Sequence, residues 1–263
     1  MLRGQLLKNE AAVRGGFRLR GLGEVSRVEA LSDGVFAFAI TLLVVSLEVP
    51  RTFDELLLTM RGFLAFAITF AMLFHCWHVQ YKFFRRYGLN DNFTVWMTAL
   101  LLFVVLFYVY PLKFVWTLFV NQVTGVPTGF SAPDGTVVPA VRREQVPMMM
   151  TVFGLGFTAV FAVFTLLYHH AYRRRRELEL TEVETFDTRT YTMENAANVA
   201  VGLLAVAIAV LGARYAPLSG FAYWLIAPAQ FLIGSARGRR RRRLFGQAAA
   251  PPAEPRPNVP ADV

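Results

Sequence analysis

The sequence predicts an all-α, polytopic membrane protein with six transmembrane helices. Hydrophobic residues make up 55% of the chain and charged residues 17%, whereas soluble domains average roughly 45–50% and about 25%. Long apolar stretches recur six times, and the segments between them carry their basic residues on alternate sides. A hydrocarbon core about 30 Å thick needs roughly 20 helical residues, so each stretch can cross a bilayer. The predicted spans lie near residues 33–50, 62–84, 93–118, 147–170, 193–213 and 217–235.

The residues at the span ends agree with this division. The first span begins with charged and hydroxyl-bearing residues and is otherwise apolar. A missing backbone donor costs least at or near a helix end, which is where we place Pro50, Pro111, Pro147 and Pro217. The segment 121–146 is rich in turn-forming residues and predicts the longest loop. The single cysteine, Cys76, falls inside the second span, so no internal disulfide is expected.

Basic residues are divided unevenly between the two sides of the predicted membrane domain. Of the 27 Lys and Arg residues, 21 lie on the side that holds both termini and 6 on the other. Segments rich in Lys and Arg stay in the cytoplasm. Both termini are therefore predicted to be cytoplasmic, in a multi-pass protein of the cell inner (plasma) membrane. We attribute the net charge of +9 to basic residues at the span ends, which are attracted to the anionic lipids of the bilayer. We therefore expect the protein to bind no nucleic acid.

Charge and composition divide the chain into three parts. Residues 1–30 form a basic cytoplasmic segment, 31–236 the six-helix transmembrane domain, and 237–263 a basic, disordered cytoplasmic tail. The run Arg239–Arg243 follows the sixth span directly. Such a run is typical of an anchor on anionic headgroups, and a specific lipid or regulatory site is the alternative.

The first span is the candidate functional helix. Positions i, i+4 and i+7 share one face of a helix, so Phe38, Leu42 and Val45 form an apolar stripe with Thr41 at its edge. One interpretation is an ordinary helix in lipid. The other is a pore lining, in which repeated subunits bring apolar rings together and gate water by dewetting. Arg27 and Asp33 would be costly to expose to lipid. They are expected to pair, or to bond to nearby backbone and indole groups.

The stretch from Arg27 through Leu31, Ser32 and Asp33 to Leu43 resembles the first helix of the bacterial relatives of the endosomal and lysosomal potassium channel, transmembrane protein 175. The family's signature reads R-x-x-x-F-S-D, followed by a helix rich in Ile, Thr and Leu. The resemblance continues through the Trp77-His78 pair of the second span and through the third. The residues that carry the match at the first helix are Arg27, Leu31, Ser32, Asp33, Gly34, Val35, Phe36, Ala37, Phe38, Ala39, Ile40, Thr41, Leu42 and Leu43.

The resemblance implies a potassium-selective cation leak channel that assembles as a homotetramer of six-helix subunits. In this family the trio matched by Arg27, Ser32 and Asp33 is a structural hub, which His78 is expected to join. The hydrophobic constriction falls on Phe38, Leu42 and Val45, and the selectivity hydroxyl on Thr41. Two residues depart from the pattern. Leu31 replaces the signature Phe, and Phe38 replaces the Ile of the narrowest ring, so a ring of four phenylalanines would seal the pore or open by rotation.

Two other functions remain open on the residues alone. All four histidines, His75, His78, His169 and His170, lie at the cytoplasmic ends of the second and fourth spans. They would suit a haem or metal oxidoreductase, although His169 and His170 point about 100° apart on a helix. A six-span chain could also be a secondary transporter of a small solute, but such carriers break their helices at mid-depth. The sequence contains no nucleophile elbow or phosphate-binding loop, so we expect neither an enzyme nor a cofactor or metal.

Overall fold

The computed structural model describes residues 13–14, 17–21, 25–45, 51–125, 129–131 and 137–245. Six of its helical segments are long and apolar enough to cross a membrane, which confirms the six predicted spans. The first five are α2 (Arg27–Val45), α4 (Phe63–Tyr87), α5 (Asn92–Thr124), α6 (Val146–Arg173) and α7 (Glu182–Val210). The sixth combines α8 (Ala216–Ala222), the 3-10 turn η2 (Tyr223–Leu225) and α9 (Ile226–Phe245).

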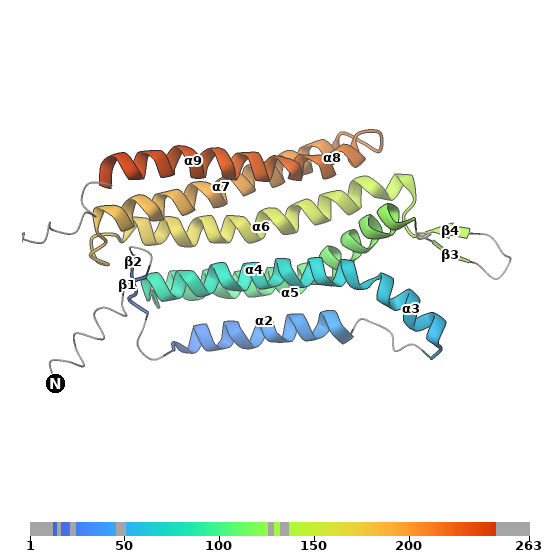
Figure 1. The fold of residues 1–263 in the computed structure, drawn as a ribbon, viewed down its shortest axis with the longest axis horizontal. Helices are drawn as coiled ribbons and strands as arrows, with labels where there is room; N and C mark the ends of the chain where they lie inside the picture. The colour runs from blue at the N-terminus through green and yellow to red at the C-terminus, as the bar shows by residue number, and fades with distance from the viewer. Residues whose placement is uncertain are drawn as a thin grey trace, which may run out of the picture.

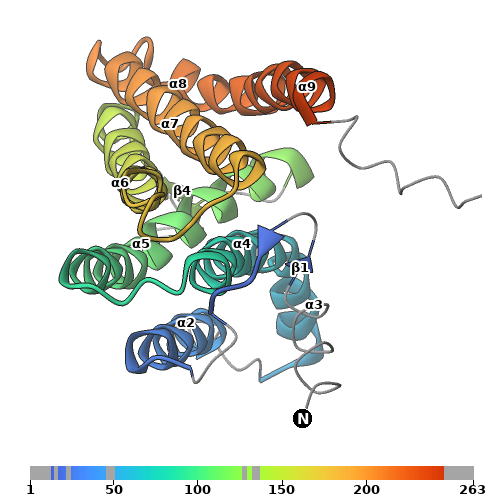
Figure 2. The same ribbon diagram turned by 90° about the vertical axis from the view of Figure 1, so that its left-hand side faces the viewer.

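The helices run alternately up and down in one elongated bundle (Figure 1). Helices α2, α4 and α5 form one side of the bundle, while α6, α7 and α9 form the other (Figure 2). The pair α6 and α7 has the most extensive contact, and α5 joins the two sides by packing on α6. The start of α2 and the end of α9 lie at the same end of the bundle (Figure 1).

Small residues let α6 approach its neighbours closely. A Cβ added at Gly202 of α7 would collide with the Thr158 hydroxyl of α6, and one added at Gly156 would collide with the Tyr108 ring of α5. Hydrophobicity drives helices together only weakly within a membrane, so close packing of this kind supplies much of the association energy. These contacts make α5, α6 and α7 the best packed part of the bundle.

Helices α5 and α7 extend beyond the predicted spans. Helix α7 begins at Glu182 rather than near residue 193, because Thr181 and Glu184 form a capping box that starts the helix earlier. Helix α5 continues to Thr124 with Pro111 inside it, not near its end. Its 33 residues span about 50 Å, more than the hydrocarbon core requires. Figure 1 shows α5 bending toward the start of α6 along its second half.

Helices α2 and α9 cross the predicted boundaries between the three parts. Helix α2 begins at Arg27, inside the segment 1–30. Helix α9 continues to Phe245, so the first residues of the tail predicted to be disordered are helical. The physical reason is contact with α7. Arg241 Nε donates to Asp187 Oδ1 at 3.0 Å, and Arg237 Nη2 donates to the Phe186 carbonyl at 2.9 Å. Residues 46–50 and 246–263, which complete the predicted first span and the tail, lie outside the described residues.

Short elements that the sequence did not predict connect the spans. Helix α3 (Phe53–Arg61) precedes α4 and starts with a capping box made by Thr52 and Glu55. The predicted long loop contains a hairpin of β3 (Gly129–Ser131) and β4 (Val137–Pro139), followed by the 3-10 turn η1 (Arg143–Gln145). A second hairpin, β1 (Val13–Arg14) with β2 (Phe17–Arg18), lies before α2.

The chain before α2 is fastened to the ends of α4 and α7. Phe17 is buried and its ring meets that of Tyr87 edge-on, with centroids 5.9 Å apart. Arg20 bonds Glu184 through both carboxylate oxygens, at 3.1 and 2.9 Å. Glu184 is 1% exposed, so its charge needs this partner. The Gly21 amide donates to the Arg85 carbonyl at 3.2 Å. We call the segment Phe17–Gly21 the N-terminal clamp.

The clamp also holds the turn between α6 and α7. Arg20 donates from Nε to the Leu178 carbonyl at 2.7 Å and from Nη2 to the Glu179 carbonyl at 3.0 Å. Glu179 has a φ of 47°, a conformation that a side chain rarely adopts. The two bonds from Arg20 therefore help to fix an otherwise unfavourable turn. One arginine thus joins the segment preceding α2 to the opposite side of the bundle.

Candidate functional site

One face of α2 packs on α4 and α5, and the opposite face is left open. The buried residues Ser32, Phe36, Ala39 and Leu43 recur every three or four positions and form a single stripe. The predicted pore residues lie on the other side of the helix. Phe38 is 56% exposed and Val45 73% exposed. Thr41 is also exposed, and Leu42 is half-buried. In the single chain, these side chains point away from the bundle.

Two side-chain hydrogen bonds tie the start of α2 to α4. Gln80 Nε2 donates to the Ser32 hydroxyl at 3.1 Å, and that hydroxyl donates to the Val28 carbonyl at 2.8 Å. Trp77 Nε1 donates to Asp33 Oδ1 at 2.8 Å. Asp33 therefore uses an indole, which was one of the two expected arrangements. Within the described chain Arg27 is exposed and forms no ion pair with Asp33.

Gln80 is the important residue that the sequence reasoning missed. It is 2% exposed, and its Oε1 atom has no hydrogen-bond partner among the described residues. The sequence does place Gln80 among apolar residues of the second span, and a polar side chain within a span needs a partner. This position could have indicated a contact with another helix. It lies three positions after Trp77, on nearly the same face of α4. The pair Trp77 and Gln80 therefore presents two donors to α2.

His78 stacks with aromatic residues of its own helix. Its ring is nearly parallel to those of Phe74 and Tyr81, with centroids 6.4 and 6.3 Å apart. The same helix carries a ladder of stacked rings from Phe63 to Tyr81. In the part of the chain that the structure describes, His78 forms no hydrogen bond to α2. Its neighbour Trp77 makes that contact instead.

The other histidines do not converge on a shared centre. His75 and His169 are exposed, and His170 bonds to a carboxylate. Among the described residues, no group of three His, Cys, Asp or Glu side chains could hold a metal ion. Of the four histidines, only His170 has an acidic partner within that part of the chain.

His170 belongs to a polar cluster that joins α5 to α6. Its Nε2 lies 2.9 Å from Asp91 Oδ2, and Thr94 donates to Asp91 Oδ1 at 2.7 Å. Arg174 Nη1 lies 3.4 Å from the same Oδ1. Burial alone would raise the pKa of the Asp91 carboxyl, but the bonds from Thr94 and His170 outweigh it and hold that pKa below its usual value. We call Asp91, Thr94, His170 and Arg174 the α5–α6 latch.

The comparisons with known proteins agree on one family. A family model described as the endosomal/lysosomal potassium channel TMEM175 matches residues 27–108, which include α2, α4 and the first half of α5. A potassium channel of Marivirga tractuosa is 38% identical over 233 residues, which are 87% of this chain and 94% of the relative. A potassium channel of Chamaesiphon minutus is 35% identical over 96 residues, 34% of this chain and 47% of that protein.

A solved structure is similar along nearly the same length. It is the crystal structure of a variant of the potassium channel MtTMEM175 bound to a nanobody fusion protein. It shares 34% sequence identity with this chain and superposes with a TM-score of 0.73. The alignment covers 87% of this chain and 99% of the other. The likeness therefore extends over all six spans and is not limited to the first helix.

The bond between Gln80 and Ser32 generates a stability prediction. The variant Ser32→Ala leaves the Gln80 amide unpaired in a buried position and should lower the free energy of unfolding by about 1–2 kcal/mol. Equilibrium unfolding in detergent micelles measures the loss. The matched control is Thr165→Ala, because among the described residues the Thr165 hydroxyl bonds only to the Phe161 carbonyl of its own helix. Equal losses in the two variants would contradict the importance of the contact between helices.

The α5–α6 latch predicts a pH dependence of stability. A carboxyl whose pKa is lowered by folding stabilises the protein above its ordinary pKa of about 4, and this contribution disappears as the pH falls through the lowered value. The variant Asp91→Asn should therefore be less stable than the wild type at neutral pH. The difference should shrink as the pH falls below about 4.

Thermal unfolding of both proteins across this pH range measures the effect. Asp54→Asn is the control, because Asp54 is an exposed carboxylate of α3. A stability gap between wild type and Asp91→Asn that stays constant with pH would show that the charge of Asp91 contributes nothing.

Proposed function

Since the chain belongs to the family of the endosomal/lysosomal potassium channel TMEM175, we propose that it is a potassium-selective leak channel whose pore is lined by α2. Relatives that match it along the chain or in part are named potassium channels. The protein is a multi-pass membrane protein, and the family transports ions rather than catalysing a reaction. Family membership disfavours the two alternatives, the secondary transporter and the haem or metal oxidoreductase.

The observation that carries the proposal is the open face of α2. A helix whose buried stripe packs on α4 and α5 must cover its other face with lipid or with further copies of the chain. That face carries Phe38, Thr41, Leu42 and Val45, which combine apolar side chains with one hydroxyl. Four copies around an axis would set these residues in rings. We therefore propose a homotetramer with a central pore, which conducts potassium ions through an apolar constriction without a charged filter.

Each ring would have a separate task. Phe38 would form the narrowest ring, with Leu42 and Val45 continuing the apolar lining toward the end of the helix. Such a constriction holds back ions because water leaves a narrow apolar space. Thr41 would offer its hydroxyl to a partly dehydrated cation and so favour one ion over another. Its hydroxyl donates to the Ala37 carbonyl at 2.9 Å, which leaves its acceptor lone pairs available to the pore.

The residues of the resembled motif would set the position of the pore helix. Ser32 and Asp33 fix α2 on α4 through Gln80 and Trp77. Arg27 is exposed at the start of α2, where it can meet a neighbouring subunit or lipid headgroups. We propose that this end of the bundle lies on the cytoplasmic side of the inner membrane. The basic ends of α4, α6 and α9 lie at the same end of the bundle, which supports this orientation.

Ion flux into liposomes containing the purified protein tests the function. With no proton gradient and no added solute, potassium uptake should exceed both sodium uptake and the uptake of protein-free liposomes. The Phe38→Ala variant should raise potassium flux by about tenfold, because shortening the apolar ring by six carbons per subunit lowers the barrier to wetting by at least about 1.4 kcal/mol.

Phe231→Ala is the matched control for the Phe38 variant. Phe231 is 72% exposed on α9, far from α2 in the bundle, so its removal should leave the flux unchanged. An unchanged flux in correctly assembled Phe38→Ala protein would remove Phe38 from the pore. Wild-type potassium uptake no greater than that of empty liposomes, with Phe38→Ala equally inactive, would reject the channel itself.

A further inference from the structure

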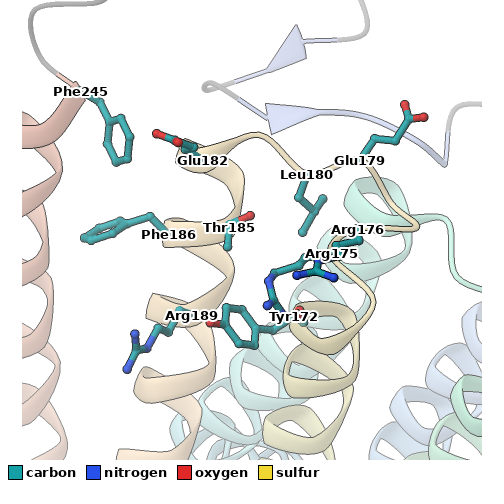
Figure 3. Close-up of a pocket in the computed structure, with 10 residues that line it drawn as sticks. All are labelled: Tyr172, Arg175, Arg176, Glu179, Leu180, Glu182, Thr185, Phe186, Arg189 and Phe245. Atoms are coloured by element: carbon teal, nitrogen blue, oxygen red, sulfur yellow. Dashed lines mark hydrogen bonds between the residues drawn. The ribbon is translucent and has the colours of Figure 1, made fainter.

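A pocket of about 560 Å³ lies at the basic end of the bundle, away from α2. It opens between the turn that joins α6 to α7 and the last turn of α9 (Figure 3). Arginines from two directions line it, namely Arg175 and Arg176 of the turn and Arg189 of α7. Phe186 of α7 and Phe245 of α9 form its apolar wall. The pocket plays no part in the proposed pore.

The pocket arginines keep donors available for a ligand. The Arg175 guanidinium lies 4.9 Å from the centre of the Tyr172 ring and donates to the Tyr172 carbonyl at 3.2 Å. Within the described ranges, none of the three has an acidic side chain at ion-pair distance. Their neighbours differ, because Arg20, Arg174 and Arg241 are each paired with a carboxylate. The pocket therefore brings together three arginines that have no acidic partner among the described residues.

The two acidic residues of the lining do not neutralise this cluster. Figure 3 shows Glu179 and Glu182 at the rim, with their carboxylates directed away from Arg175. The adjoining surface of α9 adds further positive charge through the run Arg239–Arg243. In that run Arg241 is paired with Asp187. An anion that enters the pocket meets a strongly basic surrounding.

The apolar wall makes the pocket suitable for an amphiphile. The rings of Phe186 and Phe245 meet edge-on, with centroids 6.0 Å apart. Behind them the Arg237 guanidinium lies 3.9 Å from the centre of the Phe186 ring, and its donation to the Phe186 carbonyl holds this residue in place. Donors on one side and aromatic carbon on the other match an anionic group that carries a short carbon substituent.

We propose that this pocket binds the phosphate-bearing headgroup of an anionic phospholipid. Guanidinium groups bind phosphate oxygens through two hydrogen bonds at once, which suits a pocket that Arg175, Arg176 and Arg189 line. Arg175 and Arg189 lie just beyond the apolar stretches of α6 and α7, which is the depth of lipid headgroups. The aromatic wall lies farther from the apolar stretches than Arg189, where it contacts the carbons of the headgroup alcohol. The basic run of α9 attracts the same lipid class without selecting one site.

Thermal unfolding of the full-length protein in neutral detergent tests the site. Added phosphatidylglycerol should raise Tm by several degrees, because a ligand that binds only the folded state stabilises it, whereas phosphatidylcholine should not. In the double variant Arg175→Gln/Arg189→Gln, this shift should fall by about half or more. Arg173→Gln is the control for charge alone, since Arg173 is exposed near the same end of α6 but does not line the pocket. It should keep nearly the full shift.

Each outcome decides between named explanations. An equal shift with inorganic phosphate would support the anion site and overturn lipid as its source. Equal shifts with phosphatidylglycerol and phosphatidylcholine, or an equal loss in Arg173→Gln and the double variant, would overturn the proposal. If the double variant does not fold, Arg189→Gln alone serves, because Arg189 is exposed and lacks an acidic partner among the described residues. It should lose part of the shift, and an unchanged shift would overturn the site.

Discussion

Two side chains of α4 donate hydrogen bonds to α2, and these bonds fix which face of α2 points away from the bundle. Gln80 holds the Ser32 hydroxyl and Trp77 holds the Asp33 carboxylate, on adjacent positions of α2. A purely apolar contact between two membrane helices defines rotation poorly, because lipid solvates either face equally well. Polar bonds at the membrane boundary define it sharply, and breaking the bond between Gln80 and Ser32 leaves buried groups unpaired. The open face that carries Phe38 depends on this rotation, and so does the proposed pore.

The sequence was sufficient for the architecture because membrane spans obey a strong physical constraint. Backbone groups in hydrocarbon must bond within their own helix, so length and hydropathy alone located the six spans. The same argument does not apply outside the hydrocarbon core. The early start of α7 at Glu182 and the helical end of α9 depend on capping and on contacts with arginines. Helix α3 has nine residues, which is too short to cross a membrane. Its mixture of polar and apolar residues does not distinguish it from a loop in the sequence.

The candidate site was predictable in its first helix and not in its partners. The motif from Arg27 to Asp33 could be recognised, but one sequence does not reveal which side chain meets Ser32. Gln80 could be identified only once α2 and α4 were placed side by side. The expected bond between a histidine and this hub is made by the neighbouring indole, because Trp77 rather than His78 faces α2. Successive side chains point about 100° apart around a helix, so adjacent residues of a motif contact different neighbours.

The N-terminal clamp connects the chain shortly before α2 to the distant side of the bundle. Arg20 binds the carbonyls of Leu178 and Glu179, and Leu180 beside them lines the arginine pocket. A headgroup in that pocket would contact the same turn that holds the chain just before α2. Any displacement of the turn must then be absorbed by the Arg20–Glu184 pair or transmitted to α2. The buried pair resists separation, because breaking it leaves an uncompensated charge. Lipid bound at the edge of the subunit would thus act on the segment that precedes the proposed pore helix.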